Sequence, residues 1–395
     1  MQGHQLIRNA RVVLDDQVLD DGWVLIQDGV IAQVGSGVPP TQLPAAYVVD
    51  IDRCHLMPGF IDVHVHGGGG FGFDTGPDDA LRAAAFHARH GTTSLLAGLS
   101  TAPWADICTN VAALADLPSR DLDESQAARI LGTYLEGPFI SVTRKGAHDP
   151  ALIRVPEKSD VAEIVSRGRG SVKVATVAPE VPNGMAAIGW FTSAGVAVSI
   201  GHTDATGDMF DAAATAGGTC LTHTFNGMRP PTHRDPAVFQ AITSRRVNCE
   251  VICDGLHVHP VYIRMLRELV GADRPVLVTD AVSWAGQPDG SYRSEGRAVE
   301  VRAGRVWLSG TDTLAGSCLT MGDAVRNYAE FTGAGPVELA KVSATNAAAR
   351  LGLDHRLGRI RPGFPADLVA LGPDHSVRAV MRGGKWLREY PGDGE

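Results

Sequence analysis

The order of apolar and polar positions changes near residue 59, and from there strand-like and helix-like segments alternate. Short apolar runs bounded by glycine or polar residues are typical of strands buried in a parallel sheet. Strands are expected at 61–66, 93–99, 130–136, 172–178, 196–202, 219–223, 247–253 and 276–280. Helices are expected between them, among others at 78–89, 105–117, 208–216 and 261–269. Strands and helices that alternate in this way over about 220 residues predict an α/β fold, a (β/α)8 TIM barrel.

The two ends of the chain have a different sequence pattern, which is typical of short strands separated by turns. Near the start, strands are expected at 6–13, 23–27, 30–34 and 47–50. The Asp28-Gly29 pair between two of them is a strong hairpin signal. Because the tail at 357–387 returns to this pattern, we expect a small β-sandwich domain built from both termini. The predicted domains are 1–53 with 352–395, and a catalytic barrel at 54–351.

One insert interrupts the regular alternation late in the barrel. The segment at about 281–316 carries its own short strands, expected at 298–302 and 305–308. Helices are expected after it, at 317–331 and 336–351.

Composition narrows the class of protein. The formal net charge of −9 comes without any run rich in lysine or arginine, which argues against nucleic acid as a partner. No stretch approaches the roughly 20 apolar residues that a membrane helix needs, and residues 1–10 lack a signal-peptide core. The six cysteines are scattered through apolar segments and are expected to be reduced. We therefore expect a cytoplasmic protein that binds neither membrane nor nucleic acid.

Polar side chains with metal-binding chemistry stand at the ends of the predicted strands. His64 and His66 are two apart, so they point to the same side of the first strand, which runs into four glycines. Other strands end in Glu136, His202, His223 and Asp280. A His-x-His pair alone is equally compatible with two histidines and no metal. The full set favours a metal site, because active sites of barrels lie at the carboxyl ends of their strands and burying such groups unpaired is costly.

These residues stand within motifs of a known family. They are P-G-F-I-D-V-H-V-H-G (58–67), L-E-G-P-F (135–139), K-G-A-H-D-P (145–150), S-I-G-H-T-D-A (199–205), T-H-T-F-N-G-M (222–228), D-G-L-H-V (254–258), V-T-D-A (278–281), L-A-G-S (314–317) and G-x-I-x-P-G-x-x-A-D-L-V (358–369). The chain resembles the amidohydrolase superfamily over nearly its whole length, and within it the N-acetylglucosamine-6-phosphate deacetylase family. The first and last motifs identify only the superfamily, and the central ones are more specific.

The resemblance implies a metal-dependent hydrolase that converts N-acetylglucosamine 6-phosphate to glucosamine 6-phosphate and acetate. It implies that Glu136, His202 and His223 bind the principal divalent metal. Some family members have Gln and Asn in place of the first-strand histidines and carry one metal. This chain keeps His64 and His66, which allows a second metal shared through Glu136. We expect one or two ions per subunit, with zinc favoured and iron, manganese or cobalt as alternatives.

Asp280 is assigned a catalytic role from its position in the predicted barrel, and His148 from the resemblance to the family. A metal held by imidazoles and a carboxylate activates water, and Asp280 at the last strand end is expected to take the proton from that water and pass it to the leaving amine. The alternative is a carboxylate that only binds metal. By analogy with the family, His148 is expected to stabilise the developing oxyanion. The alternative for His148 is a loop histidine that caps backbone groups.

Recognition of the sugar phosphate needs local groups, because the overall charge is negative. The candidates are His257, Arg234 and the backbone N–H groups of Asn226 and Gly227. Arg234 matches the arginine of the family that reaches in from a neighbouring subunit, which implies a homodimer. The alternative is a surface salt bridge, and the nearby Arg229 could be confused with it.

Two rival functions remain at this point. One is another amidohydrolase, acting on a cyclic amide or deaminating a nucleobase, which would need no phosphate site. The other is a catalytically inactive barrel that serves as a binding protein. Retention of all the expected metal ligands and of Asp280 weighs against the inactive barrel.

Overall fold

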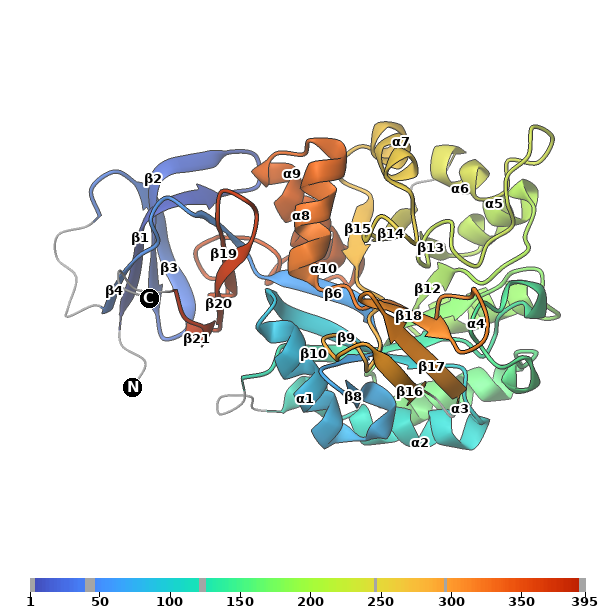
Figure 1. Cartoon of the computed structure of the whole chain (residues 1–395). Helices are drawn as coiled ribbons and strands as arrows, with labels where there is room; N and C mark the ends of the chain where they lie inside the picture. The colour runs from blue at the N-terminus through green and yellow to red at the C-terminus, as the bar shows by residue number, and fades with distance from the viewer. Residues whose placement is uncertain (1–3, 40–46, 121–125, 245–246, 295–296, 391–395) are drawn as a thin grey trace.

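Parallel strands form the central barrel of the computed structural model, which describes residues 4–39, 47–120, 126–244, 247–294 and 297–390 (Figure 1). In chain order the barrel strands are β6 (Phe60–Val65), β9 (Thr92–Ser100), β10 (Arg129–Glu136), β11 (Val172–Val177), β12 (Ala197–Ile200), β13 (Gly218–Leu221), β14 (Asn248–Ile252) and β15 (Pro275–Val278). Each pairs with its neighbour in sequence. The backbone N–H of Asp280 donates to the carbonyl of His64 at 2.8 Å, which joins the last strand to the first. The predicted TIM barrel is confirmed.

Three strands end two residues earlier than expected, and the reason lies in the backbone. His202, His223 and Asp280 have positive φ angles of 46°, 26° and 49°. A residue in this left-handed region departs from the extended backbone of a strand, and in these three strands the regular pairing stops before it. Each strand therefore ends before its polar residue, which begins the loop.

Helices cover the outside of the barrel. They are α1 (Pro77–Ala88), α2 (Trp104–Leu114), α3 (Lys158–Gly168), α4 (Gly184–Ser193), α5 (Gly207–Thr215), α6 (Val238–Ser244), α7 (Pro260–Val270) and α8 (Met321–Thr332). Helix α8 begins later than predicted. The backbone N–H of Ser317 donates to the carbonyl of Asp280, and the side chain of Thr320 caps the helix by accepting from the backbone N–H of Asp323. The expected helix at 336–351 consists of α9 (Pro336–Ala340), a π turn (Lys341–Thr345) and α10 (Asn346–Arg350).

Strands from both termini combine in one further eight-stranded sheet beside the barrel (Figure 1). Its order is β21 (Lys385–Arg388), β20 (Val377–Arg382), β19 (Leu368–Leu371), β5 (His55–Pro58), β1 (Gln5–Val13), β2 (Val18–Gln27) and β3 (Val30–Ser36), with β4 (Tyr47–Asp50) paired to β1. The sheet has its own apolar core, which includes Ile7, Val24 and Met381. One correction concerns β5, which we placed in the barrel segment. It pairs with β1 and β19, so it belongs to the terminal sheet.

The late insert forms a three-stranded antiparallel sheet of β16 (Gly290–Ser294), β17 (Arg297–Arg302) and β18 (Arg305–Leu308). The sequence pattern predicted β17 and β18 but missed β16. Figure 1 shows this sheet in front of the barrel strands. Leu308 of β18 lines the same cavity as the strand-end polar residues.

Two further expectations concern membranes and thiols. Within the described ranges, no helix combines the length and apolar character needed to span a bilayer. All six cysteines are free, and all but Cys318 are buried.

Candidate metal centre

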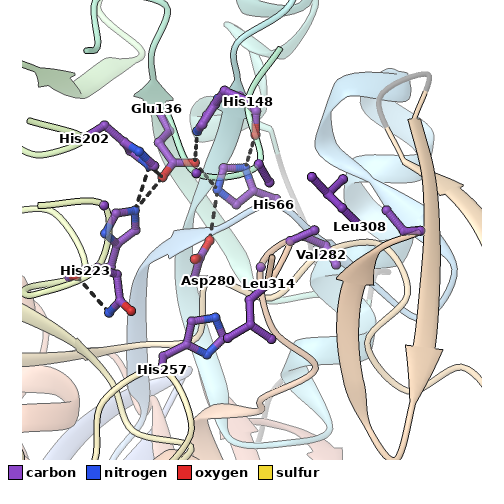
Figure 2. Close-up of a pocket in the computed structure, with 18 of the residues that line it drawn as sticks. His66, Glu136, His148, His202, His223, His257, Asp280, Val282, Leu308 and Leu314 are labelled. Carbon is purple, nitrogen blue, oxygen red and sulfur yellow. Dashed lines mark hydrogen bonds and ion pairs between the residues drawn. The ribbon is translucent and has the colours of Figure 1, made fainter. Parts of the chain in front are cut away.

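A cavity of about 190 Å³ opens at the carboxyl ends of the barrel strands, and most of the expected site residues line it (Figure 2). The residues that meet there come from distant parts of the chain. They are His66, Glu136, His148, His202, His223, Asn226, Gly227, His257 and Asp280. His64 lies just beneath, with no exposed surface. The structure thus brings together the side chains predicted to ligate metal.

The first group of donor atoms is centred on one oxygen of Glu136. Its Oε1 lies 2.8 Å from His223 Nε2 and 3.0 Å from His202 Nε2, and the two nitrogens are 3.0 Å apart. Two imidazoles and a carboxylate are a common ligand set for a divalent metal.

The second group uses the other oxygen of Glu136. His66 Nε2 lies 3.1 Å from Glu136 Oε2 and 3.3 Å from Asp280 Oδ1. His64 Nε2 is 3.2 Å from His66 Nε2. One ligand atom from each of His64, His66, Glu136 and Asp280 falls within 4.8 Å of the others. Glu136 therefore stands between two potential cation positions.

The hydrogen-bond partners of His202 indicate that these donors suit a cation. His202 Nδ1 lies 2.8 Å from the carbonyl oxygen of Arg144, which can only accept, so Nδ1 carries the proton. In the neutral ring Nε2 is then a bare lone pair, and it faces another imidazole nitrogen and a carboxylate oxygen. Lone pairs that converge in this way repel one another unless a positive charge lies among them. The residues present fit a divalent metal ion.

Electrostatics point the same way. Burial lowers the pKa of His66, but its contacts with Asp280 and Glu136 outweigh burial and raise the pKa to about 10. Burial likewise opposes protonation of His202, yet the hydrogen bond with Glu136 raises the pKa. The pKa values of Glu136 and Asp280 are lowered, because histidine contacts overcome the effect of burial. The two carboxylates thus stabilise positive charge on the neighbouring histidines. A bound metal ion would supply that charge in place of the protons on the imidazole rings.

The loop after β13 packs closely against the site. Gly227 has a φ of +58°, and a Cβ there would lie 2.8 Å from His202 Nδ1. Only glycine combines this left-handed backbone with so close an approach to the imidazole ring. Gly227 therefore lets the loop lie against the imidazole ring of His202.

His148 differs from the other histidines of the cavity. Burial and the neighbouring His202 lower the pKa of His148 to about 3, so its ring is neutral at physiological pH. Its Nε2 lies 3.7 Å from Glu136 Oε2. Its Nδ1 is buried without a hydrogen-bond partner among the described residues. A neutral imidazole with a spare nitrogen can donate one hydrogen bond into the cavity.

The residues expected to bind phosphate are only partly together. His257 lines the cavity, and its Nδ1 lies 2.6 Å from Asp254 Oδ2. This nitrogen is therefore occupied by Asp254, and Nε2 is the nitrogen left for a ligand. The backbone N–H of Asn226 is not available as expected, because it donates to the carbonyl of His223 at 2.9 Å. Arg234 is exposed, beside His233, and is not among the cavity-lining residues. Arg229 is occupied by Asp204 and Asp235.

The sequence reasoning missed two features of the site. Arg297 of β17 lines the cavity, and it is the sole Lys or Arg side chain among the lining residues that the structure describes. Glu250 of β14 lies buried beneath the cavity and contacts His64. An acidic residue inside the apolar run V-N-C-E-V-I-C could have signalled Glu250. No pattern marked Arg297.

Comparisons with known proteins agree with this geometry. A model of the amidohydrolase family matches residues 55–387. The N-acetylgalactosamine-6-phosphate deacetylase of Escherichia coli O157:H7 is 36% identical over 377 residues, covering 95% of this chain and 97% of that protein. The N-acetylglucosamine-6-phosphate deacetylase of Bacillus subtilis strain 168 is 33% identical over 376 residues, covering 94% of each.

A solved structure is similar over the whole chain. It is a mutant N-acetyl-D-glucosamine-6-phosphate deacetylase from Mycobacterium smegmatis, in complex with N-acetyl-D-glucosamine-6-phosphate. The TM-score is 0.90 at 37% identity, covering 98% of this chain and all of that one.

Proposed function

Because the chain belongs to the amidohydrolase family, we propose that it removes the acetyl group of N-acetylglucosamine 6-phosphate, giving glucosamine 6-phosphate and acetate. The observation that carries this proposal is the convergence of Glu136, His202 and His223, whose ligand atoms lie 2.8 to 3.0 Å apart. The relatives named above support the substrate class, an amino-sugar phosphate.

The ligand set supports one or two divalent ions per subunit. Glu136, His202 and His223 would hold one ion, and His64, His66, Glu136 and Asp280 a second. Bound there, a divalent metal polarises a carbonyl group and lowers the pKa of water. We infer zinc, which suits nitrogen and carboxylate ligands, with iron, manganese or cobalt as alternatives.

Asp280 is assigned the proton transfers. Its lowered pKa keeps it a carboxylate at neutral pH, so it can accept a proton. As water adds to the acetamide carbon, Asp280 takes the proton of that water. When the C–N bond breaks, the same proton passes to the amine nitrogen, and the free amine leaves together with acetic acid, which ionises to acetate in solution.

His148 is assigned to the acetamide oxygen. Negative charge grows on that oxygen as the tetrahedral intermediate forms, and a neutral N–H donor in a buried site stabilises it. The lowered pKa of His148 fits a neutral donor rather than a cation.

Phosphate recognition is assigned to His257, the backbone N–H of Gly227 and two arginines. Arg297 would act from the same chain, since it lines the cavity. Arg234 lies away from the cavity of its own chain, which supports its contribution across a homodimer interface.

The free cysteines support a reducing compartment, and we infer the cytoplasm.

The test is acetate release from N-acetylglucosamine 6-phosphate, with and without chelator. N-acetylgalactosamine 6-phosphate is tested beside it, because the E. coli relative carries that name. We expect chelator-sensitive acetate release from one or both epimers. Hydrolysis of a cyclic amide or deamination of a nucleobase, with no acetate release from either sugar, would favour another amidohydrolase activity. Absence of bound metal and of all activity would favour the inactive barrel.

A further inference from the structure

Glu250 is a carboxylate sealed inside the barrel, directly below the proposed metal ions. It lies on β14, and its side chain has no exposed surface. Its Oε2 lies 2.9 Å from His64 Nδ1 and 3.0 Å from the backbone nitrogen of His223. One oxygen thus touches a ligand of the second cation position and the backbone of a ligand of the first.

The other oxygen faces a buried arginine. Glu250 Oε1 lies 2.5 Å from Arg350 Nη1, and only 1% of the Arg350 side chain is exposed. Arg350 comes from α10, so the pair ties that helix to the inside of the barrel. The Tyr134 hydroxyl also donates to Glu250, at 3.2 Å. All these neighbours can donate hydrogen bonds, and an ionised carboxylate is the side chain that accepts from all of them.

We propose that Glu250, paired with Arg350, is the positioning residue that makes His64 a ligand for a second metal ion. The inference rests on the proposed function, because it concerns the metal site described there. An acceptor at Nδ1 fixes the proton on that nitrogen and leaves Nε2 as a lone pair. His64 Nε2 is the nitrogen that faces His66 and Asp280.

A purely structural role would not require this arrangement. A buried ion pair brings little net stability, because the cost of removing both charges from water offsets their attraction. An apolar pair of similar volume would fill the same space. The position of Oε2 against His64 Nδ1 is what an apolar pair would not reproduce.

Glutamine at this position shows why the charge matters. If the amide oxygen of Glu250→Gln faces His64, the amide NH2 faces the N–H of Arg350, and two donors meet. If the amide is turned the other way, its NH2 faces His64 Nδ1, which must then give up its proton. The proton moves to Nε2, and that nitrogen no longer binds metal. Either orientation weakens the second site.

The test counts Zn²⁺ ions per chain and measures their affinities. Wild type and Glu250→Gln are dialysed against Zn²⁺, the metal is measured by mass spectrometry, and each affinity is obtained by chelator competition. The matched control is Glu338→Gln. Glu338 accepts two hydrogen bonds of 2.6 Å from Arg267, between α9 and α7, and no described contact links it to the metal ligands. Circular dichroism checks that each variant is folded.

We expect two Zn²⁺ in wild type and in Glu338→Gln. In Glu250→Gln we expect the second affinity to fall about 10- to 100-fold, and the first to fall less. If Glu250→Gln does not fold, Glu250→Leu with Arg350→Met removes both the acceptor at His64 Nδ1 and the buried unpaired charge, and is expected to show the same loss. Wild-type affinity for two ions in either folded variant overturns the inference. A wild type that binds only one ion also overturns it, yet leaves the proposed hydrolase intact. A wild type that binds none contradicts the proposed function itself.

Discussion

Asp280 donates its backbone N–H to the carbonyl oxygen of His64 at 2.8 Å, so the two ends of the barrel sheet meet at the proposed metal site. The side chains of the same two residues approach to 3.7 Å between Asp280 Oδ1 and His64 Nε2. The contact that closes the barrel therefore also holds two of the proposed metal ligands next to each other. His64 and Glu136 lie on strands of the barrel, where side chains are held more rigidly than on loops.

Replacement of Asp280 by asparagine tests the proton transfers. Asparagine keeps the shape and a metal-facing oxygen but cannot accept a proton. We expect Asp280→Asn to lose at least about a hundredfold in kcat for acetate release while it retains the metal at Glu136, His202 and His223. Turnover like that of wild type would remove Asp280 from its assigned role.

His148→Ala removes the donor assigned to the acetamide oxygen. Loss of one such donor costs about 10²- to 10³-fold in kcat. KM and the content of bound metal are expected to change little, because His148 acts on charge that develops only in the transition state. Steady-state kinetics and metal analysis measure both. A variant with unchanged kcat would favour the alternative in which His148 only caps loop backbone.

Arg297→Ala tests phosphate recognition from within the chain. We expect KM for the sugar phosphate to rise about tenfold or more, as for loss of a hydrogen bond to a charged group. Acetate release from unphosphorylated N-acetylglucosamine, measured beside it, is expected to stay unchanged. An equal effect on both substrates would mean that Arg297 shapes the cavity and does not read the phosphate.

Mixing two inactive variants tests whether Arg234 acts across a dimer. In a heterodimer of Arg234→Ala and Asp280→Asn, one site has an intact Asp280 and an intact Arg234 from the other copy. We expect co-refolded equal mixtures to regain about a quarter of the wild-type activity, since random pairing places that site in half of the dimers. No recovery in a proven dimer would contradict the shared site.

His87 provides a test of stability against pH. It is buried in α1, with its Nε2 2.8 Å from the carbonyl oxygen of Gly67, and burial lowers the pKa of His87 to about 4. The unfolded chain, with a histidine pKa of about 6.5, therefore binds the extra proton between these values, and stability falls as the pH is lowered through this window. The full effect is roughly 3 kcal/mol.

His87→Gln keeps a donor for Gly67 but does not titrate. Urea unfolding of both proteins without added metal, at about pH 7 and about pH 4.5, compares their free energies of unfolding. We expect wild type to lose more stability than the variant on acidification. Equal losses would contradict the assigned pKa.

The sequence predicted most of the fold because its signals are local. A strand such as 61–66 shows itself by an apolar run, and the residues at its end follow from where that run stops. Barrel topology then predicts that distant strand ends meet at one rim. For that reason, the sequence was sufficient to predict that Glu136, His202 and His223 lie close together.

What could not be predicted depends on packing between segments. Arg350 reaches Glu250 from α10, a hundred positions later, and no periodicity in the sequence indicates that contact. The strands at His202, His223 and Asp280 end early because these residues have positive φ angles. Histidine and aspartate adopt this conformation more often than most residues, but nothing in the local pattern indicates which of them does so. The backbone N–H of Asn226 was predicted to bind phosphate, but in the folded loop it donates to the carbonyl of His223.

The most direct test of metal-dependent deacetylation is a titration of metal into chelated wild-type protein, with bound metal and acetate release followed in the same samples. We expect no acetate release from N-acetylglucosamine 6-phosphate without metal, and a rate that rises in proportion to occupancy of the site at Glu136, His202 and His223. Full acetate release from protein shown to hold no metal would contradict a metal-dependent mechanism at this site.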